Sequence, residues 1–313
     1  MITSITLLIL SLAALYIGAG WLVKGSAALA IKAKISPLVI GLTIVAFGTS
    51  APELVVNLNA TLTGQGDIAI GNVIGSNIFN IGFILGISAI IYPIKVKEQL
   101  TKLDIPIMLV ATILLVLFFW NGHLGRAEGI LFVIGITLYT LFSLYYSRKK
   151  NLDKDNIELE EQPKPWFVDT LYMIGGLAIL VFASRLLVNN AVSIAKELGV
   201  SEAVIGLTIV SAGTSMPELA TSVVAAIKKN PEIAIGNIVG SNLFNILAIA
   251  GITATIHPIH SNNVNYIDLL VMLGMSVLLL PLVKSGQKIS RAEGVVLVII
   301  YLSYLIWLLR DAI

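Results

Sequence analysis

The sequence contains no cysteine, which excludes disulfides and thiolate metal sites. It is also poor in charge, because only 12% of its 313 residues are charged, whereas a soluble domain carries about a quarter. The small net charge of +2 gives no reason to expect a nucleic-acid partner. With 57% hydrophobic residues, these shortages exclude an ordinary soluble domain and indicate a protein that lies mostly within a lipid bilayer.

Polar stretches are short, and long apolar runs fill the sequence between them. A spanning helix needs about 20 apolar residues, so the length is enough for about ten spans. The runs predict helices near residues 2–23, 38–60, 68–91, 104–120, 127–147, 167–188, 203–227, 233–256, 266–283 and 292–309. We expect the first run to be a retained helix, because no positive charge precedes it and no cleavage site of small residues follows it.

The two halves of the sequence repeat each other. Residues 36–94 align with residues 201–259 without a gap, and 33 of the 59 aligned positions are identical. The offset of 165 also brings residues 126–129 onto residues 291–294. Five predicted spans in each half is an odd number, so the second half enters the membrane from the opposite side.

The predicted fold class is therefore an all-α membrane protein, with ten transmembrane helices arranged as two inverted five-helix repeats. We expect residues 1–148 to form the first repeat, residues 149–165 a cytoplasmic linker and residues 166–313 the second repeat.

The basic residues predict an orientation, since cytoplasmic loops carry the excess of Lys and Arg. With the N-terminus outside, 16 of the 20 basic residues fall on the inside, and only Arg126, Arg185, Lys196 and Arg310 fall outside. We therefore expect a multi-pass protein of the cell membrane with both termini extracellular.

Two carboxylates are predicted where the bilayer makes them costly. Of the 18 acidic residues, only Glu53 and Glu218 lie deep inside predicted spans, and they occupy equivalent positions of the two repeats. An ionised group at the bilayer centre costs at least about 2.5 kcal/mol, so it is usually paired or functional. A structural ion pair is one explanation, but no predicted span has a Lys or Arg at a similar depth. The sequence therefore favours a mobile cation as their partner.

Other oxygen-bearing groups surround each glutamate. The hydroxyl residues just before them are Thr49 and Ser50 in the first repeat, and Thr214 and Ser215 in the second. Pro52 lacks an N–H, so we expect the carbonyl of Gly48 to leave the helix ladder, and Pro217 acts in the same way on Gly213. Carboxylate, hydroxyl and carbonyl oxygens are the ligands that hard cations prefer.

The next predicted helix of each repeat carries polar side chains at a spacing of four, which places them on one face. They are Asn72, Ser76 and Asn80 in the first repeat, and Asn237, Ser241 and Asn245 in the second. We interpret Asn72 and Asn237 as interhelical hydrogen bonders or helix starts. The two serines and the other two asparagines lie further along, at the depth of an ion site.

Other candidates are weaker. His123, His257 and His260 fall in predicted loops, and we interpret them as ordinary solvated histidines. The acidic run at 153–161 lacks the central glycine of an EF-hand loop, so we interpret it as a solvated linker. An intramembrane hydrolase is disfavoured, because no HExxH motif occurs and no histidine lies within a predicted span. We expect no catalytic residues. A Ca²⁺ channel stays open as an alternative.

The paired motifs GTS-x-PE and GSN-x-FN resemble the α-repeats of the cation/Ca²⁺ exchanger superfamily, in particular its Na⁺/Ca²⁺ exchanger branch. They stand at 48–53 and 213–218, and at 75–80 and 240–245. The resemblance covers the full sequence and implies ten helices with ion sites at mid-membrane. It implies a secondary-active antiporter that exchanges Na⁺ for Ca²⁺ by alternating access, in which the first helix of each repeat slides against the core.

The resemblance also implies roles for individual residues. By motif position, Glu53 and Glu218 would form a central Ca²⁺ site with the backbone carbonyls of Thr49 and Thr214. Flanking Na⁺ sites would use Ser50, Ser215, Ser76 and Ser241 and the carbonyls of Ala46 and Ser211, while Asn80 and Asn245 would line the centre.

Two departures narrow the expected coupling. Asn245 stands where some relatives carry aspartate and where K⁺-dependent exchangers use an acid, so K⁺ dependence is disfavoured. The segments GTSAPE and GTSMPE differ from the GNA-type segment typical of proton-coupled exchangers. The short linker fits a minimal prokaryotic transporter. H⁺/Ca²⁺ and K⁺-dependent Na⁺/Ca²⁺ exchange stay as alternatives. Ca²⁺, Na⁺ and the lipid bilayer are the implied partners, with no cofactor, nucleic acid or protein partner implied.

Overall fold

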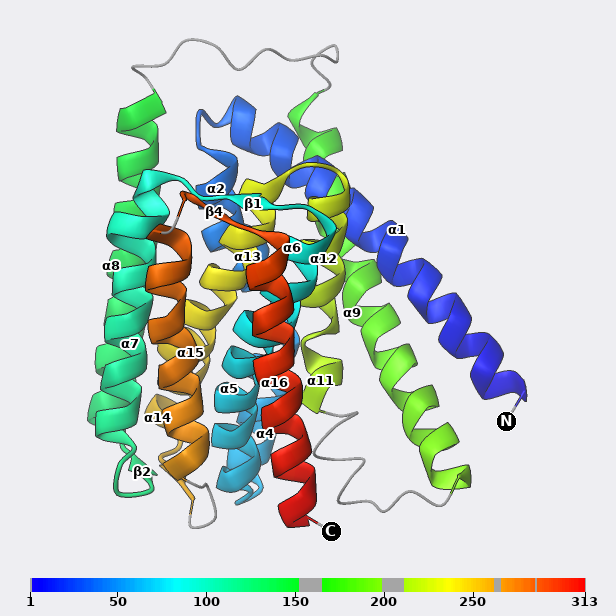
Figure 1. Ribbon diagram of the computed structural model, residues 1–313, viewed down its shortest axis with the longest axis vertical. Coiled ribbons are helices and arrows are strands. Elements are labelled where there is room, and N and C mark those ends of the chain that lie inside the picture. The colour runs from blue at the N-terminus through cyan, green and yellow to red at the C-terminus, as the bar shows by residue number, and fades with distance from the viewer. Residues whose placement is uncertain (1, 152–164, 199–210, 262–265, 285, 313) are drawn as a thin grey trace.

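The structure is a computed structural model that describes residues 2–151, 165–198, 211–261, 266–284 and 286–312. Helices make up most of this part of the chain (Figure 1). Several of them contain π-helical segments, which are labelled η here.

The first repeat contains five helical spans, some of them divided into segments. In order, its elements are α1 (Ile2–Lys32), α2 (Pro37–Ile40), η1 (Gly41–Val45), α3 (Ala46–Thr49), α4 (Ala51–Leu62), α5 (Gly66–Phe79), η2 (Asn80–Leu85), α6 (Gly86–Ile91), β1 (Ile94–Lys95), η3 (Leu100–Asp104), α7 (Ile105–Phe118), β2 (His123–Leu124) and α8 (Arg126–Asn151).

The second repeat follows the same order. Its described elements are α9 (Trp166–Glu197), α11 (Ser211–Thr214), α12 (Met216–Ile227), α13 (Pro231–Leu243), η5 (Phe244–Ala250), α14 (Gly251–Ile256), β3 (Ile259–His260), α15 (Tyr266–Lys284), β4 (Lys288–Ile289) and α16 (Arg291–Ala312).

Eight helices of the described chain are long and apolar enough to span a membrane, and the bent pair Pro37–Thr49 and Ala51–Leu62 adds a ninth. The predicted span near 203–227 is described from residue 211 onward, and its earlier residues lie outside the described part. Most of the predicted linker, residues 152–164, also lies outside it. The N-terminal end of α1 and the C-terminal end of α16 lie toward the same end of the molecule (Figure 1), as an even number of spans requires.

The first helix of each repeat is longer than predicted. α1 continues to Lys32 instead of ending near residue 23, and α9 continues to Glu197 instead of ending near residue 188. Both lie obliquely beside the rest of the bundle (Figure 1), and a tilted helix needs more residues to cross the same thickness. The predicted bounds were wrong because polar residues near their ends, such as Lys24 and Lys196, were assigned to loops.

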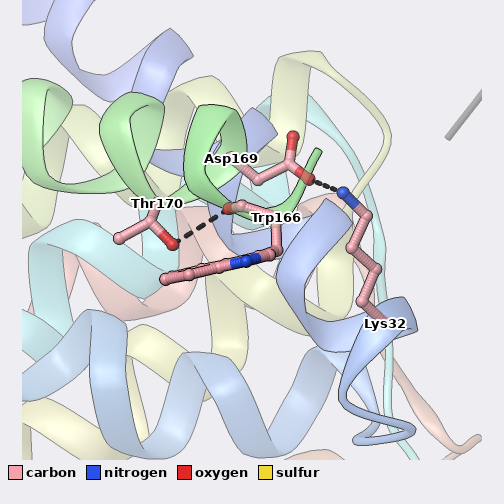
Figure 2. A network of polar contacts seen from close by, with 4 residues as sticks. All are labelled: Lys32, Trp166, Asp169 and Thr170. Atoms are coloured by element: carbon pink, nitrogen blue, oxygen red, sulfur yellow. Dashed lines mark hydrogen bonds and ion pairs between the residues drawn. The ribbon is translucent and has the colours of Figure 1, made fainter. Parts of the chain in front are cut away.

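Glycines bring α1 and α9 into backbone contact. A Cβ on Gly25 would lie 2.6 Å from the carbonyl oxygen of Asp169, and one on Gly176 would lie 2.5 Å from the nitrogen of Leu22. No larger residue fits at either position without moving a helix. At one end of this pair the ammonium of Lys32 forms an ion pair with the buried carboxylate of Asp169, while the Thr170 hydroxyl donates to the Trp166 carbonyl on α9 (Figure 2).

The span formed by α13, η5 and α14 lies at the centre of the bundle, and its most apolar stretch is entirely buried. Two glycines on α13 allow the broken span of the first repeat to approach closely. A Cβ on Gly236 or on Gly240 would lie 2.6 Å from a backbone carbonyl, of Leu38 and Leu42 respectively. This close contact holds the broken span of one repeat against the polar stripe of the other.

Two short antiparallel strand pairs join the repeats at opposite ends of the molecule. β1 pairs with β4, so that Lys95 lies opposite Lys288. β2 pairs with β3, so that His123 lies opposite His260. The repeat offset of 165 relates the two pairs to each other, because it brings Lys95 onto His260 and His123 onto Lys288.

Candidate functional site

Each glutamate lies at the start of a helix inside a broken span. Ser50 interrupts the helix with φ −86° and ψ 4°, and Ser215 does the same with φ −88° and ψ 11°. The chain restarts as α4 and α12, with Glu53 and Glu218 in their first turns. Both carboxylates therefore belong to the first turn of a helix, where the helix dipole is positive.

The two repeats hydrogen-bond each other's carboxylate. The Ser50 hydroxyl donates to Oε1 of Glu218 at 2.8 Å, and the Ser215 hydroxyl donates to Oε1 of Glu53 at 3.2 Å. Ser215 also lies 3.2 Å from the hydroxyl of Ser76. Four of the predicted site residues are thus brought together in one reciprocal arrangement across the repeat interface.

The threonines are held by the asparagines that begin the stripe. The Thr49 hydroxyl donates to Oδ1 of Asn237 at 3.1 Å, and the Thr214 hydroxyl donates to Oδ1 of Asn72 at 3.3 Å. The interpretation of these two asparagines as interhelical hydrogen bonders agrees with these contacts. Each threonine hydroxyl therefore donates its hydrogen to an asparagine of the other repeat.

Several buried oxygens in this region have no hydrogen-bond partner in the described part of the chain. They include Oε2 of Glu53, Oε2 of Glu218, Oδ1 of Asn80, Oδ1 of Asn245 and the hydroxyl of Ser241. A buried acceptor without a partner is destabilising by roughly 1–3 kcal/mol, and more when it is charged. Two carboxylate and two amide oxygens, all buried, are the donor set that a hard cation takes.

One contributor was missed by the sequence reasoning. Nδ2 of Asn80 donates to Oδ1 of Asn242 at 3.2 Å, and Nδ2 of Asn242 lies 3.7 Å from the sulfur of Met108. Asn242 therefore turns the Asn80 amide so that its oxygen stays unpaired. The asparagine was visible within GSN-x-FN, but it lies off the spacing-four stripe.

The carbonyls freed by the prolines differ between the repeats. The Gly213 carbonyl accepts a hydrogen bond of 2.7 Å from the Ser184 hydroxyl on α9, which agrees with its predicted release from the helix ladder. The equivalent position on α1 is Ala19, which has no hydroxyl, and the Gly48 carbonyl is approached by the Ser50 N–H.

The remaining predicted residues lie close by. Ser241 is buried on α13, and its hydroxyl has no hydrogen-bond partner among the described residues. The Ala46 carbonyl accepts hydrogen bonds from the Ser50 N–H at 3.0 Å and from the Thr49 hydroxyl at 3.3 Å. Ser211 begins α11, and its side chain lies outside the described part.

Asp104 and Asp169 are also buried, but they lie near the starts of their spans and not deep inside them as Glu53 and Glu218 do. Asp104 ends η3 at the start of the fourth span and accepts a hydrogen bond of 3.0 Å from the Tyr139 hydroxyl. In the second repeat Tyr304 donates to Asp268 at 2.7 Å. Asp104 falls on the predicted boundary of a span, where an acidic residue is common. Its protein partner indicates a structural role at a helix end.

The central site is closed to solvent. Glu53 and Glu218 are each 1% exposed. A hollow of about 370 Å³ lies between α1, η2 and α12, but its walls are apolar side chains such as Leu12, Phe83 and Met216, and it holds neither glutamate. The arrangement is an occluded pair of carboxylates between the two repeats of a chain whose described helices are apolar enough to span a membrane.

The comparisons with known proteins agree with this arrangement. The chain belongs to the sodium/calcium exchanger protein family, whose profile matches residues 3–145 and 168–310. It is 39% identical to the putative antiporter CaxA of Alkalimonas amylolytica, covering 90% of this chain and 91% of that protein. It is 33% identical to the sodium/calcium exchanger MaX1 of Methanosarcina acetivorans, covering 96% and 97%.

A solved structure has the same fold. The sodium-calcium exchanger NCX_Mj superposes with a TM-score of 0.84 at 32% identity, covering 97% of this chain and 98% of that one. The family and this match confirm the predicted membership of the cation/Ca²⁺ exchanger superfamily in its prokaryotic form. They also confirm the all-α fold of ten transmembrane helices in two repeats. The protein is a multi-pass membrane protein of a family of cation antiporters.

Proposed function

We propose that this protein is a secondary-active antiporter that exchanges Na⁺ for Ca²⁺ across the cell membrane by alternating access, electrogenically and without K⁺. The observation that carries the proposal is the reciprocal pair of carboxylates. Each glutamate has one oxygen bound by a serine of the other repeat and one buried oxygen with no partner among the residues that the structure describes. A bound cation would satisfy both free oxygens at once.

The proposed ligands follow from this arrangement. Glu53 and Glu218 would take Ca²⁺ with the backbone carbonyls of Thr49 and Thr214. Na⁺ would use the same carboxylates with the serines at 50, 215, 76 and 241 and the carbonyls of Ala46 and Ser211. Asn80 and Asn245 would line the centre with neutral amide oxygens, which add donors without adding charge.

The charge of the site explains exchange. Two ionised carboxylates contribute −2, so one Ca²⁺ neutralises them, and three Na⁺ would leave the loaded site at +1. An empty site would bury two uncompensated charges, which disfavours return of the unloaded transporter. Ca²⁺ and Na⁺ would therefore alternate on the same carboxylates. One net charge per cycle couples transport to voltage at about 2.3 kcal/mol per 100 mV.

The test is ⁴⁵Ca²⁺ uptake into proteoliposomes that contain the purified protein. We expect uptake to need an outward Na⁺ gradient and to proceed when choline replaces K⁺. A membrane potential can then be set with K⁺ and valinomycin. An inside-positive potential should speed uptake, because three Na⁺ leave the vesicle for each Ca²⁺ that enters.

Three outcomes would contradict the proposal. Uptake driven by an H⁺ gradient without Na⁺ would indicate H⁺/Ca²⁺ exchange. An absolute requirement for K⁺ would indicate K⁺-dependent exchange. Ca²⁺ flux without any counter-ion gradient would indicate a channel.

A further inference from the structure

The strand pair β2–β3 brings two histidines from different repeats into contact. His123 and His260 are partners in the antiparallel register, and their Nδ1 atoms lie 3.2 Å apart. Their rings stack with centroids 4.3 Å apart. This contact differs from the sequence interpretation of two ordinary solvated histidines, because strand pairing directs both rings to one point.

The loops around the pair are fixed by further hydrogen bonds. The His123 N–H donates to Oδ1 of Asn121 at 3.1 Å, and the Ser261 N–H donates to the Gly122 carbonyl at 2.9 Å. The Ser261 hydroxyl also bonds the carboxylate of Asp67 at the start of α5. The backbone that presents the two imidazoles is therefore held in place before any ligand arrives.

Two ring nitrogens 3.2 Å apart are within hydrogen-bond distance, and the tautomer of each ring decides which nitrogen donates and which accepts. Neutral imidazole has one donor and one acceptor nitrogen, so the pair can share a proton, and a metal ion can replace that proton. Two nitrogens at about 2.05 Å from a tetrahedral metal lie about 3.3 Å apart. The observed 3.2 Å matches this separation. The rings are inclined by only 27°, so the exposed ring of His260 must turn for both nitrogens to converge.

We propose that His123 and His260 form a binding site for a divalent transition cation of the Zn²⁺ and Cu²⁺ class, which bridges the two repeats at one end of the molecule. Imidazole nitrogen suits such borderline ions, whereas Ca²⁺ and Na⁺ prefer oxygen. The site is therefore chemically separate from the central carboxylates.

The neighbouring groups fit a water-completed site. No group of three or more His, Cys, Asp or Glu side chains suited to a metal occurs in the described residues, so the chain supplies two ligands and water the others. Two of the neighbouring groups lie close to Gly125, which has no side chain. Oε2 of Glu128 would be 2.7 Å from a Cβ at this position, and Nε2 of His123 would be 3.3 Å from it. A carboxylate near the outer nitrogen of a metal-bound histidine is a common supporting contact.

The molecule contains its own control for this site. The equivalent pair in β1–β4 is Lys95 and Lys288, opposed in the same register but unable to bind a metal while protonated. His257 is a second control, because it lies three residues from His260 and its ring faces the carbonyl of Pro258.

The experiment is a Cu²⁺ titration of the purified full-length protein followed by electron paramagnetic resonance, with saturating Ca²⁺ present to occupy the central carboxylates. We expect one ion with splitting from two nitrogens. Replacing either histidine, in His123→Gln or His260→Gln, should weaken binding at least about tenfold, since even outer contacts of metal ligands have such effects. His257→Gln should bind as the wild type does.

The double variant Lys95→His/Lys288→His tests the strand geometry directly, because it should bind a second ion with the same signal. Wild-type protein without a two-nitrogen signal would overturn the proposal, as would undiminished binding in His123→Gln and His260→Gln. Failure of the double variant to gain an ion would overturn the assignment of binding to the strand register. Gel filtration and helical circular dichroism of each variant show that it is folded.

Discussion

The centre of the molecule and its two ends differ in how closely the repeats correspond. At the centre Ser50 reaches Glu218 as Ser215 reaches Glu53, so these two contacts are copies of each other in the two repeats. At the ends one strand pair opposes two lysines and the other opposes two histidines. The two repeats therefore keep the same residues at the central site, which they share. They differ at the two ends of the molecule, each of which faces a different side of the membrane.

The largest effect should come from removing a central charge. We expect Glu53→Gln and Glu218→Gln each to reduce ⁴⁵Ca²⁺ uptake into proteoliposomes to background, because a single carboxylate cannot neutralise Ca²⁺. Folding should persist, since a neutral amide is less costly to bury than a carboxylate. The matched control is Asp104→Asn, which changes a buried carboxylate that is bound by Tyr139, and it should retain transport. Full uptake in either glutamine variant would refute the central site.

The second prediction concerns which end faces which solution. Single cysteines in this cysteine-free chain at two exposed positions, Glu98→Cys and His257→Cys, lie near the lysine pair and the histidine pair respectively. From the distribution of basic residues we expect an impermeant maleimide added to intact cells to label position 257 fully and position 98 only after lysis. The reverse pattern would invert the proposed orientation.

A smaller effect is expected from the reciprocal serines. Ser50→Ala and Ser215→Ala each remove a hydrogen bond to a carboxylate, which contributes about 1.5–3 kcal/mol. We therefore expect the Ca²⁺ concentration for half-maximal uptake to rise about tenfold or more in each, and by similar factors in the two. A large effect in one variant alone would show that the two halves of the centre are not equivalent in function.

The smallest expected effect is on stability, and it concerns a hydrogen bond that α9 makes and α1 does not. Ser184→Ala removes the hydrogen bond to the Gly213 carbonyl and should lower stability by about 1–3 kcal/mol, measured as a lower melting temperature in detergent. Ala19→Ser is the repeat-related reverse change and should not lower it. Equal melting temperatures for wild type and Ser184→Ala would mean that the carbonyl finds another donor.

The fold and the two central carboxylates could be predicted from the sequence. The sequence shows both the duplication and the position of each glutamate within a predicted span. Glu53 and Glu218 stand at equivalent positions far from any span boundary, and the bilayer leaves few explanations for them. Asn242 could not be found, since its contact with Asn80 depends on how helices of different repeats rotate against each other. The π-helical segments η2 and η5 begin at Asn80 and Phe244. They change the direction in which the following side chains point, which a regular repeat of 3.6 residues per turn does not predict.

The ends were harder to predict for a different reason. The lengths of α1 and α9 follow from their tilt, which no local pattern encodes. The contact between His123 and His260 joins residues 137 positions apart, and strand segments of two residues give no periodic signal.

The ion pair between Lys32 and Asp169 limits the number of independent movements available to the molecule (Figure 2). Backbone contact at Gly25 and Gly176 joins α1 to α9 along their length, and the ion pair fastens them at one end. In the proposed alternating-access cycle, α1 and α9 would therefore move together as one body. One movement of a single body would open only one side of the membrane at a time, so exclusion of simultaneous opening would follow from the mechanical connection between the helices.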